Sequence, residues 1–177
     1  MIVYRHAPSD RSFFWEDNHQ PPARWHGNDE GPVQYCADTP DGAWAEFLRH
    51  EEITGIDELM EINRAIWAIE IPDTEQFATT ELIPAILLGG KDTYEYCRQQ
   101  ARKIRETGAK GMEAPSVALL PGFARGMKTD DGLKNGEDRN GKVMVIFGKR
   151  NDLVGWIAAI GRPDTSILSK VRHFSMM

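Results

Sequence analysis

The chain has 177 residues, of which 41% are hydrophobic and 27% charged, and its formal net charge at pH 7 is −6. This length predicts one domain spanning residues 1–177, and the composition excludes a disordered chain. An acidic chain is poorly suited to hold a nucleic-acid backbone, so no direct nucleic-acid partner is expected. A small anionic ligand remains compatible with the charge, because it needs only a locally basic cleft.

Neither a secretion signal nor a membrane span is expected. The first ten residues, MIVYRHAPSD, lack the apolar stretch of a signal peptide, and no run approaches the roughly 18 apolar residues of a spanning helix. Cys36 and Cys97 form neither a disulfide framework nor a zinc-ligand spacing, so both are expected to be buried free thiols. We therefore expect a cytoplasmic protein without a membrane partner.

The first part of the chain predicts two strands and a helix. Residues 1–7 (MIVYRHA) form an apolar-aromatic run typical of a strand, whereas residues 8–32 lack a period and predict an extended loop. A second strand is predicted at 33–37 (VQYCA). Thr39, as N-cap before a proline, predicts a helix over residues 40–50. The predicted buried face of this helix consists of Ala43, Trp44, Phe47 and Leu48.

Strands outnumber helices in the rest of the chain. Residues 122–141 hold five glycines and predict a mobile excursion loop. The predicted elements are short helix 57–64, strand 66–71, helix 92–107, strands 117–120, 143–147 and 153–160, and a last edge strand at 167–174. Because strands and helices do not alternate regularly, the pattern favours an α+β fold with mostly antiparallel pairing.

Three polar side chains in this pattern are candidates for chemistry. Arg24 lies in the loop, Tyr35 in the second strand and Glu46 on the helix that follows it. Glu46 falls beside the apolar face of that helix, so its carboxylate can border a cleft. On spacing alone, the three residues are more often ordinary structural side chains than members of a functional site.

Two further residues stand out less clearly. Arg5 lies inside an apolar strand, where a charge belongs either at a strand edge or in a polar site. Ser116 follows a proline and is by default a hydroxyl at the start of a strand, without the GxSxG elbow of a serine hydrolase. The histidines form no tight ligand spacing, so no metal site is expected.

Three segments resemble the RES domain family. They are VYRHA at the start, RWHGNDEGPVQYCADTPDGAWAEFLRH from Arg24 onward, and GAKGMEAPSVAL, which contains Ser116. The family takes its name from an arginine, a glutamate and a serine, which here correspond to Arg24 (or Arg5), Glu46 and Ser116. The chain departs from the usual family pattern around the Arg-Trp pair, at Pro22, Ala23 and His26.

The resemblance implies a fold similar to ADP-ribosyltransferases, with two small, mostly antiparallel sheets flanked by helices around an NAD⁺ cleft. It implies that NAD⁺ is a substrate cleaved at the nicotinamide–ribose bond, by hydrolysis or phosphorolysis, with no recycled cofactor. Glu46, Arg24 and Tyr35 would be catalytic, and Arg5, Arg24, Tyr35 and Ser116 would bind NAD⁺. Many family members are toxins of toxin–antitoxin pairs, so a partner antitoxin that covers the cleft is expected.

Two other functions stay open, namely mono-ADP-ribosylation of a protein target and NAD⁺ binding without catalysis. A homodimer is also left open.

Overall fold

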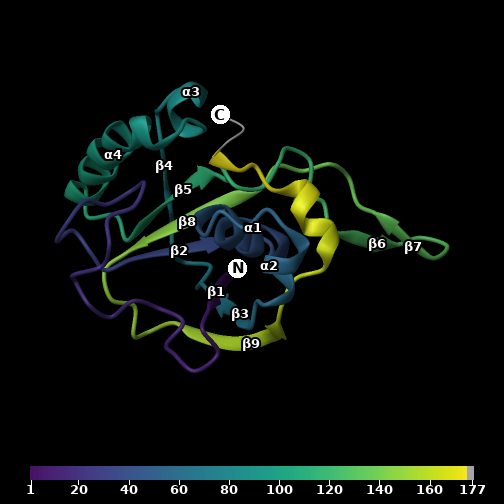
Figure 1. The fold of residues 1–177 in the computed structure, drawn as a ribbon. Helices are drawn as coiled ribbons and strands as arrows, with labels where there is room; N and C mark the ends of the chain where they lie inside the picture. Colours follow the sequence, from purple (N-terminus) through teal and green to yellow (C-terminus); the bar gives the residue numbers. More distant parts are fainter. Residues whose placement is uncertain (175–177) are drawn as a thin grey trace.

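Most strands belong to one large sheet. The computed structural model describes residues 1–174, and within them seven strands are joined in the order β4-β5-β8-β2-β1-β3-β9 (Figure 1). Among these described strands, the β4–β5 pair is parallel and the other pairs are antiparallel. The strands are β1 (Ile2–Ala7), β2 (Val33–Ala37), β3 (Arg64–Glu70), β4 (Ala78–Thr79), β5 (Gly111–Pro115), β8 (Lys142–Phe147) and β9 (Val154–Gly161).

A second sheet is a small hairpin that projects from the body of the molecule (Figure 1). It consists of β6 (Met127–Thr129) and β7 (Leu133–Asn135), joined by a turn in which Gly132 has a φ of 100°. A side chain rarely adopts this backbone conformation, so the glycine suits the turn. The hairpin lies within residues 122–141, where the sequence predicts a loop. The α+β class with mostly antiparallel pairing is confirmed, with one large and one small sheet.

The helices are short and their ends follow local signals. The Thr39 side chain accepts a hydrogen bond from the Gly42 amide at 3.0 Å, as its predicted role as N-cap requires. The helix predicted at 92–107 is observed as a 3₁₀ turn followed by an α-helix. The helices are α1 (Pro40–His50), α2 (Ile56–Met60), α3 (Pro84–Leu87), η1 (Lys91–Thr93), α4 (Tyr94–Glu106) and η2 (Thr165–Lys170). None of the helices within residues 1–174 is long and apolar enough to cross a membrane.

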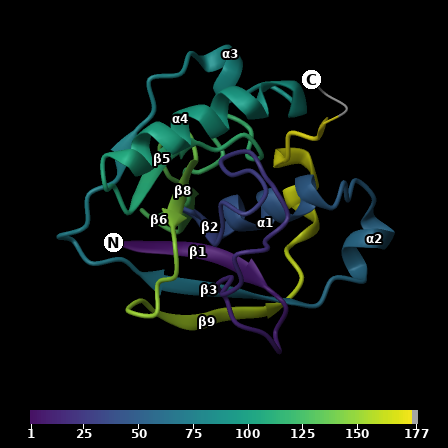
Figure 2. The same ribbon diagram turned by 90° about the vertical axis from the view of Figure 1, so that its left-hand side faces the viewer.

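One face of the large sheet is covered by α1, η2 and α4. An apolar cluster under α1 and η2 includes Phe47 and Ile66, and a second cluster under α4 includes Val145. Val33 and Ala37 both lie on β2, four residues apart, so their side chains point to the same face. Val33 belongs to the second cluster and Ala37 to the first, and therefore α1 and α4 cover the same face of the sheet (Figure 2).

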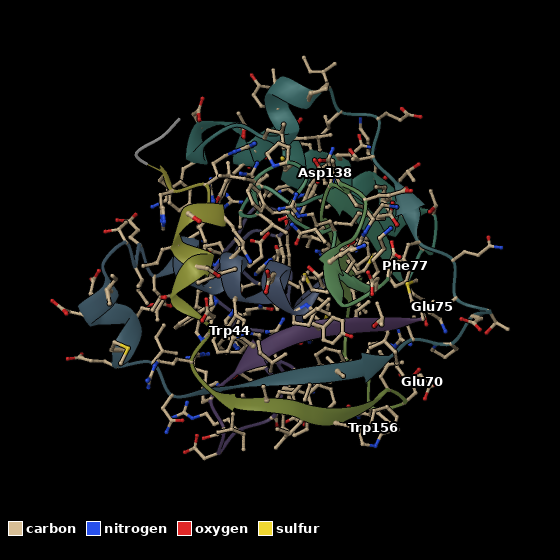
Figure 3. The ribbon with its side chains drawn as sticks, turned by 90° about the vertical axis from the view of Figure 1, so that its right-hand side faces the viewer. Trp44, Glu70, Glu75, Phe77, Asp138 and Trp156 are labelled. Carbon is tan, nitrogen blue, oxygen red and sulfur yellow. The ribbon has the colours of Figure 1, made fainter. Side chains whose placement is uncertain are left out.

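The opposite face is covered by loop residues. Val3 of β1 and Cys36 of β2 are buried there in a cluster against which Phe13 and Phe14 of the long loop pack. Phe77, labelled in Figure 3, packs against the same cluster. Cys36 on this face and Cys97 on α4 are both buried and free, as predicted. The faces matter for function, because a side chain on one of them cannot reach a site on the other.

The strand predicted at 117–120 is wrong; the strand is β5, which ends at Pro115. Ser116 ends it, since its hydroxyl accepts hydrogen bonds from the amides of Ala118 at 3.3 Å and Leu119 at 3.1 Å. Such local bonds turn the backbone away from a strand ladder. The apolar run after Ser116 is buried under α1 without forming a strand, apart from an isolated bridge between Leu119 and Val171.

Two other predicted elements differ from those observed. Residues 165–170 form the 3₁₀ helix η2 in place of the start of an edge strand, because Asp164 caps it by accepting from the Ser166 amide at 2.9 Å. The two edge strands of the large sheet are β4 and β9. The short helix predicted at 57–64 ends at Met60, and Arg64 begins β3.

Candidate functional site

The carboxylate of Glu46 lies in contact with Ser116 on the face that α1 and α4 cover. The Ser116 hydroxyl donates a hydrogen bond to Glu46 Oε1 at 3.1 Å, across 70 positions of sequence. The same hydroxyl oxygen accepts from the Ala118 and Leu119 amides, so its one proton is directed at the carboxylate. Ser116 is only 7% exposed and Glu46 is half-buried. The structure thus holds a glutamate side chain in one orientation at the edge of α1.

Burial is the main influence on this carboxyl group. Removal from water raises the pKa of Glu46, and the opposing effects of Ser116, Arg49 and Arg24 only partly compensate. Glu46 therefore accepts a proton more readily than an ordinary surface glutamate. Perturbation of this kind by burial and specific partners is common at functional sites.

Arg24 is buried, its charge acts to lower the pKa of this glutamate, and it holds the chain around Gly89. One terminal nitrogen, Nη2, donates to the Gly89 carbonyl at 2.7 Å, and the other, Nη1, donates to the Leu87 carbonyl at 3.2 Å. The guanidinium also stacks over the Tyr94 ring, with Cζ 4.6 Å from the ring centroid. No carboxylate within residues 1–174 forms an ion pair with it in this structure. Arg24 therefore contributes positive charge to the site and shapes the loop after α3.

Tyr35 holds the loop segment that carries Arg24. Its hydroxyl accepts from the Trp25 amide at 3.0 Å and contacts His26 Nδ1 at 3.0 Å. His26 Nε2 lies 3.0 Å from the Pro21 carbonyl, which can only accept, so Nε2 carries the ring proton and Tyr35 donates to Nδ1. Burial lowers the pKa of His26 and raises that of Tyr35, which keeps both groups neutral. The Tyr35 hydroxyl is thereby committed to the segment that carries Arg24.

Arg5 is not brought to this group. It lies two residues from Val3 on β1 and so points to the same face as Val3, opposite the face that α1 covers, where its guanidinium lies 6.0 Å from the Phe14 ring. Its Nη1 donates to the Tyr35 carbonyl at 2.9 Å, a backbone contact made within the sheet. The structure therefore groups Arg24, Tyr35, Glu46 and Ser116 on one face and leaves Arg5 on the other.

Four residues that the sequence did not single out lie around the same site. Arg49 follows Glu46 by three positions on α1, a spacing at which helix side chains meet. Tyr94 stacks on Arg24, and the ring of Phe174 lies 4.0 Å from Arg49 Cζ and 4.9 Å from Lys91 Nζ. The helical spacing could have identified Arg49, whereas no local pattern connects Phe174 with Lys91.

An open hollow of about 550 Å³ borders this group. Its lining consists of Gly89, Gly90, Lys91, Asp92 and Phe174. Arg24 donates to Gly89 and Arg49 contacts Phe174, so two residues that line the hollow are held by arginines whose charges also act on Glu46. Within residues 1–174, no cluster of His, Cys, Asp and Glu has the geometry to hold a metal ion. The arrangement combines one buried carboxylate with several cations, which suits a ligand carrying both a developing positive centre and phosphates.

Comparison with known proteins identifies the family. The RES domain model matches residues 2–125. The solved structure of the MbcT–MbcA toxin–antitoxin complex of M. tuberculosis contains a similar fold, with a TM-score of 0.57 and 13% identity over 95% of this chain and 86% of that chain. No curated protein matches the chain. Because the family model covers more than half of the sequence, the protein belongs to the RES domain family.

Proposed function

We propose that the protein consumes NAD⁺ by cleaving its nicotinamide–ribose bond and that it is the toxin of a toxin–antitoxin pair. The observation that carries the proposal is the half-buried Glu46 carboxylate, which accepts a hydrogen bond from Ser116 and on which the charges of Arg49 and Arg24 act. Membership of the RES domain family and the likeness in fold to a chain of a toxin–antitoxin complex support it.

The reaction explains why a fixed carboxylate is needed. The bond between ribose C1′ and the nicotinamide nitrogen breaks, and nicotinamide leaves with the bonding electrons as a neutral molecule. Positive charge then develops on the ribose, as in glycoside cleavage through an oxocarbenium-like state. Glu46 would stabilise this charge, and water or phosphate would attack C1′ and lose a proton. Ser116 would keep the carboxylate in place.

The cations would hold the anionic part of NAD⁺. Arg24 uses its donors on backbone carbonyls, so its role would be to supply charge and to fix the Gly89 loop. Tyr35 would act as a positioning residue, because its hydroxyl is bonded to the segment around Arg24. Arg5, on the other face of the sheet, has no part in this proposal.

An antitoxin partner follows from the same proposal. An enzyme that drains NAD⁺ from its own cell must be held inactive until needed. The MbcT–MbcA structure is a complex of a toxin with its antitoxin, and we propose a comparable partner that covers the site of this chain. A partner segment that presents a carboxylate or chain terminus to the cationic site would mimic the phosphates of NAD⁺.

Incubating the purified protein with NAD⁺, with and without phosphate, tests the reaction directly. Free ADP-ribose would indicate hydrolysis, and ADP-ribose-1″-phosphate would indicate phosphorolysis. Label transferred to a protein would indicate ADP-ribosylation, and unchanged NAD⁺ would leave only binding. The first two outcomes support the proposal with water or phosphate as the acceptor. Labelled protein would show that the same bond is cleaved with a protein acceptor and would overturn the choice of acceptor, and unchanged NAD⁺ would overturn the cleavage itself.

Expression in a bacterial host from a tightly controlled promoter tests the toxin role. We expect growth arrest with falling NAD⁺, abolished by Glu46→Gln and relieved by co-expression of the cognate antitoxin. Normal growth and normal NAD⁺ at high levels of folded protein would show that the chain is not such a toxin.

A further inference from the structure

Residues 170–174 run alongside the chain that follows Ser116 and end against two cations. The Leu120 amide donates to the Lys170 carbonyl at 2.8 Å, and the Arg172 amide donates to the Ala118 carbonyl at 2.7 Å. Figures 1 and 2 both show this segment rising from η2 toward α3. The segment therefore spans from the Ser116 side of the site to the loop after α3.

Phe174 lies where the two cations converge. Its ring is 4.0 Å from Arg49 Cζ and 4.9 Å from Lys91 Nζ, and Arg49 Nη1 also donates to the Arg172 carbonyl. Because both cations contact one ring, the distance between them is at most the sum of these two contacts. α1 and η1 thus bring two positive groups from distant parts of the sequence to one point.

The contact with the ring leaves the Lys91 ammonium accessible to an anion. Lys91 is exposed, contact with an aromatic face does not use its N–H donors, and no residue within 1–174 accepts a hydrogen bond from Nζ, so water solvates this group until an anion binds. Phosphate oxygens accept charge-assisted hydrogen bonds from both guanidinium and ammonium groups. The preferred ligand of this pair is therefore a phosphate group.

The backbone beside the pair is open to such a ligand. Gly89 and Gly90 line the same hollow as Lys91 and Phe174. A Cβ atom on Gly89 would lie 2.4 Å from the Thr93 side chain and 2.8 Å from the Ala85 carbonyl, so packing of the loop against its own neighbours requires glycine at this position. Asp92 is the acidic group that lines the hollow, and it opposes an anion there.

We propose that Arg49 and Lys91 form a phosphate-binding subsite and that Phe174 occupies it until the ligand displaces the ring. The proposal rests on the proposed function in one respect, since the diphosphate of NAD⁺ is the natural ligand there. Inorganic phosphate, the co-substrate of phosphorolysis, carries the same chemistry. Displacement of Phe174 reduces the apparent affinity for either ligand by the fraction of molecules in which the subsite is free.

Calorimetric titration with ADP-ribose, inorganic phosphate and adenosine tests the subsite. ADP-ribose contains the diphosphate but no nicotinamide bond to cleave, and adenosine contains no phosphate. The proteins compared are the unaltered chain, Phe174→Ala, a chain ending at residue 172, and each of these two changes combined with Lys91→Gln. A chain ending at residue 174 is the control for shortening, and the chain ending at residue 172 is compared with it.

Phe174→Ala and the chain ending at residue 172 are each expected to bind ADP-ribose about tenfold more tightly, because the subsite is no longer filled. Lys91→Gln should remove most of that gain, and Asp92→Asn should increase binding further. Adenosine binding should not depend on Lys91. A matching effect on inorganic phosphate would assign the subsite to free phosphate as well, whereas an effect on ADP-ribose alone would assign it to the diphosphate.

Equal affinity for ADP-ribose and phosphate in all variants, with thermal unfolding unchanged, would overturn the subsite. NAD⁺ turnover measured on the same samples separates this result from the proposed function. If NAD⁺ is turned over but substitution of Phe174 or Lys91 has no effect, the proposed function is supported and the subsite is excluded. If phosphate binding depends on Lys91 but NAD⁺ is not turned over, the subsite is supported and the proposed function is excluded.

Discussion

The contact between Glu46 and Ser116 is the feature on which the chemistry depends at the scale of single residues. Glu46→Gln keeps the size and the hydrogen bond from Ser116 but removes the negative charge. We expect NAD⁺ turnover to fall at least about a hundredfold, the usual effect of losing one preorganised electrostatic group. Turnover is measured as nicotinamide release by the folded variant. Near-normal turnover would exclude Glu46 from the reaction.

The same substitution has an opposite effect on stability. Burial raises the pKa of Glu46, so folding favours its protonated form. Below the pKa of an unfolded glutamate both states are protonated and no stability is lost. As the pH rises through the higher folded-state pKa, the folded protein must hold a buried charge and its stability falls. Glu46→Gln should therefore be more stable than the unaltered chain at neutral pH and equally stable at about pH 4. Urea unfolding at both pH values tests this, and a less stable variant at neutral pH would contradict it.

Ser116→Ala tests the contribution of the Ser116 hydroxyl while Glu46 stays in place. The hydrogen bond from Ser116 lowers the pKa of Glu46, so its removal should raise that pKa further. The acidic limb of the pH–turnover profile should then move to higher pH, with a smaller loss of turnover than in Glu46→Gln. Ser169→Ala is the matched control, because Ser169 is exposed and, among the residues described, its hydroxyl donates to the Ser166 carbonyl within η2 alone. An unchanged limb would show that Ser116 does not act through Glu46.

At the scale of elements, β2 positions the loop before it through one hydroxyl. Tyr35→Phe leaves the Trp25 amide and His26 Nδ1 without their buried partner. We expect the free energy of unfolding to fall by about 1–3 kcal/mol, and NAD⁺ affinity to fall because Arg24 is held less firmly. Tyr4→Phe on β1 is the control, since Tyr4 packs on the same face of the sheet. Urea unfolding and titration of both variants test the prediction, which fails if they behave alike.

At the scale of the whole molecule, β9 leaves a long apolar edge uncovered within the described residues. Trp156, Ile157 and Ile160 are 52%, 46% and 63% exposed, and β9 carries no charged side chain (Figure 3). Ile157 faces Trp67 of β3 and Ile160 faces Ala65, so both isoleucines lie on one face of the sheet. An antiparallel β9 from a second copy would place Ile157 of each chain opposite Ile160 of the other. Exposed edges without charges invite such pairing.

We therefore expect a homodimer through β9. Ile160→Lys should shift the protein toward monomer in analytical ultracentrifugation. Leu133→Lys, on the hairpin and 72% exposed, is the control and should leave the oligomeric state unchanged. A monomeric unaltered chain would contradict the expectation.

The sequence alone determined the elements that local signals specify. The cap at Thr39 and the apolar spacing after it define α1, short apolar runs locate β1, β2, β8 and β9, and alternation locates β3. The order of these elements was enough for the α+β class. The position of Glu46 beside the apolar face of α1 was also predictable, because helical geometry fixes it once the helix is known.

Only the tertiary structure decided which side chains share a site. A strand pattern does not say what covers each face, so Arg5 could not be separated from Arg24 before the packing of Phe14 was known. Ser116 and Glu46 are in contact although they are 70 positions apart in the sequence, and Phe174 contacts Lys91 although the two are also far apart in the sequence. Such contacts depend on how the sheet and helices pack, and no local period or cap encodes them.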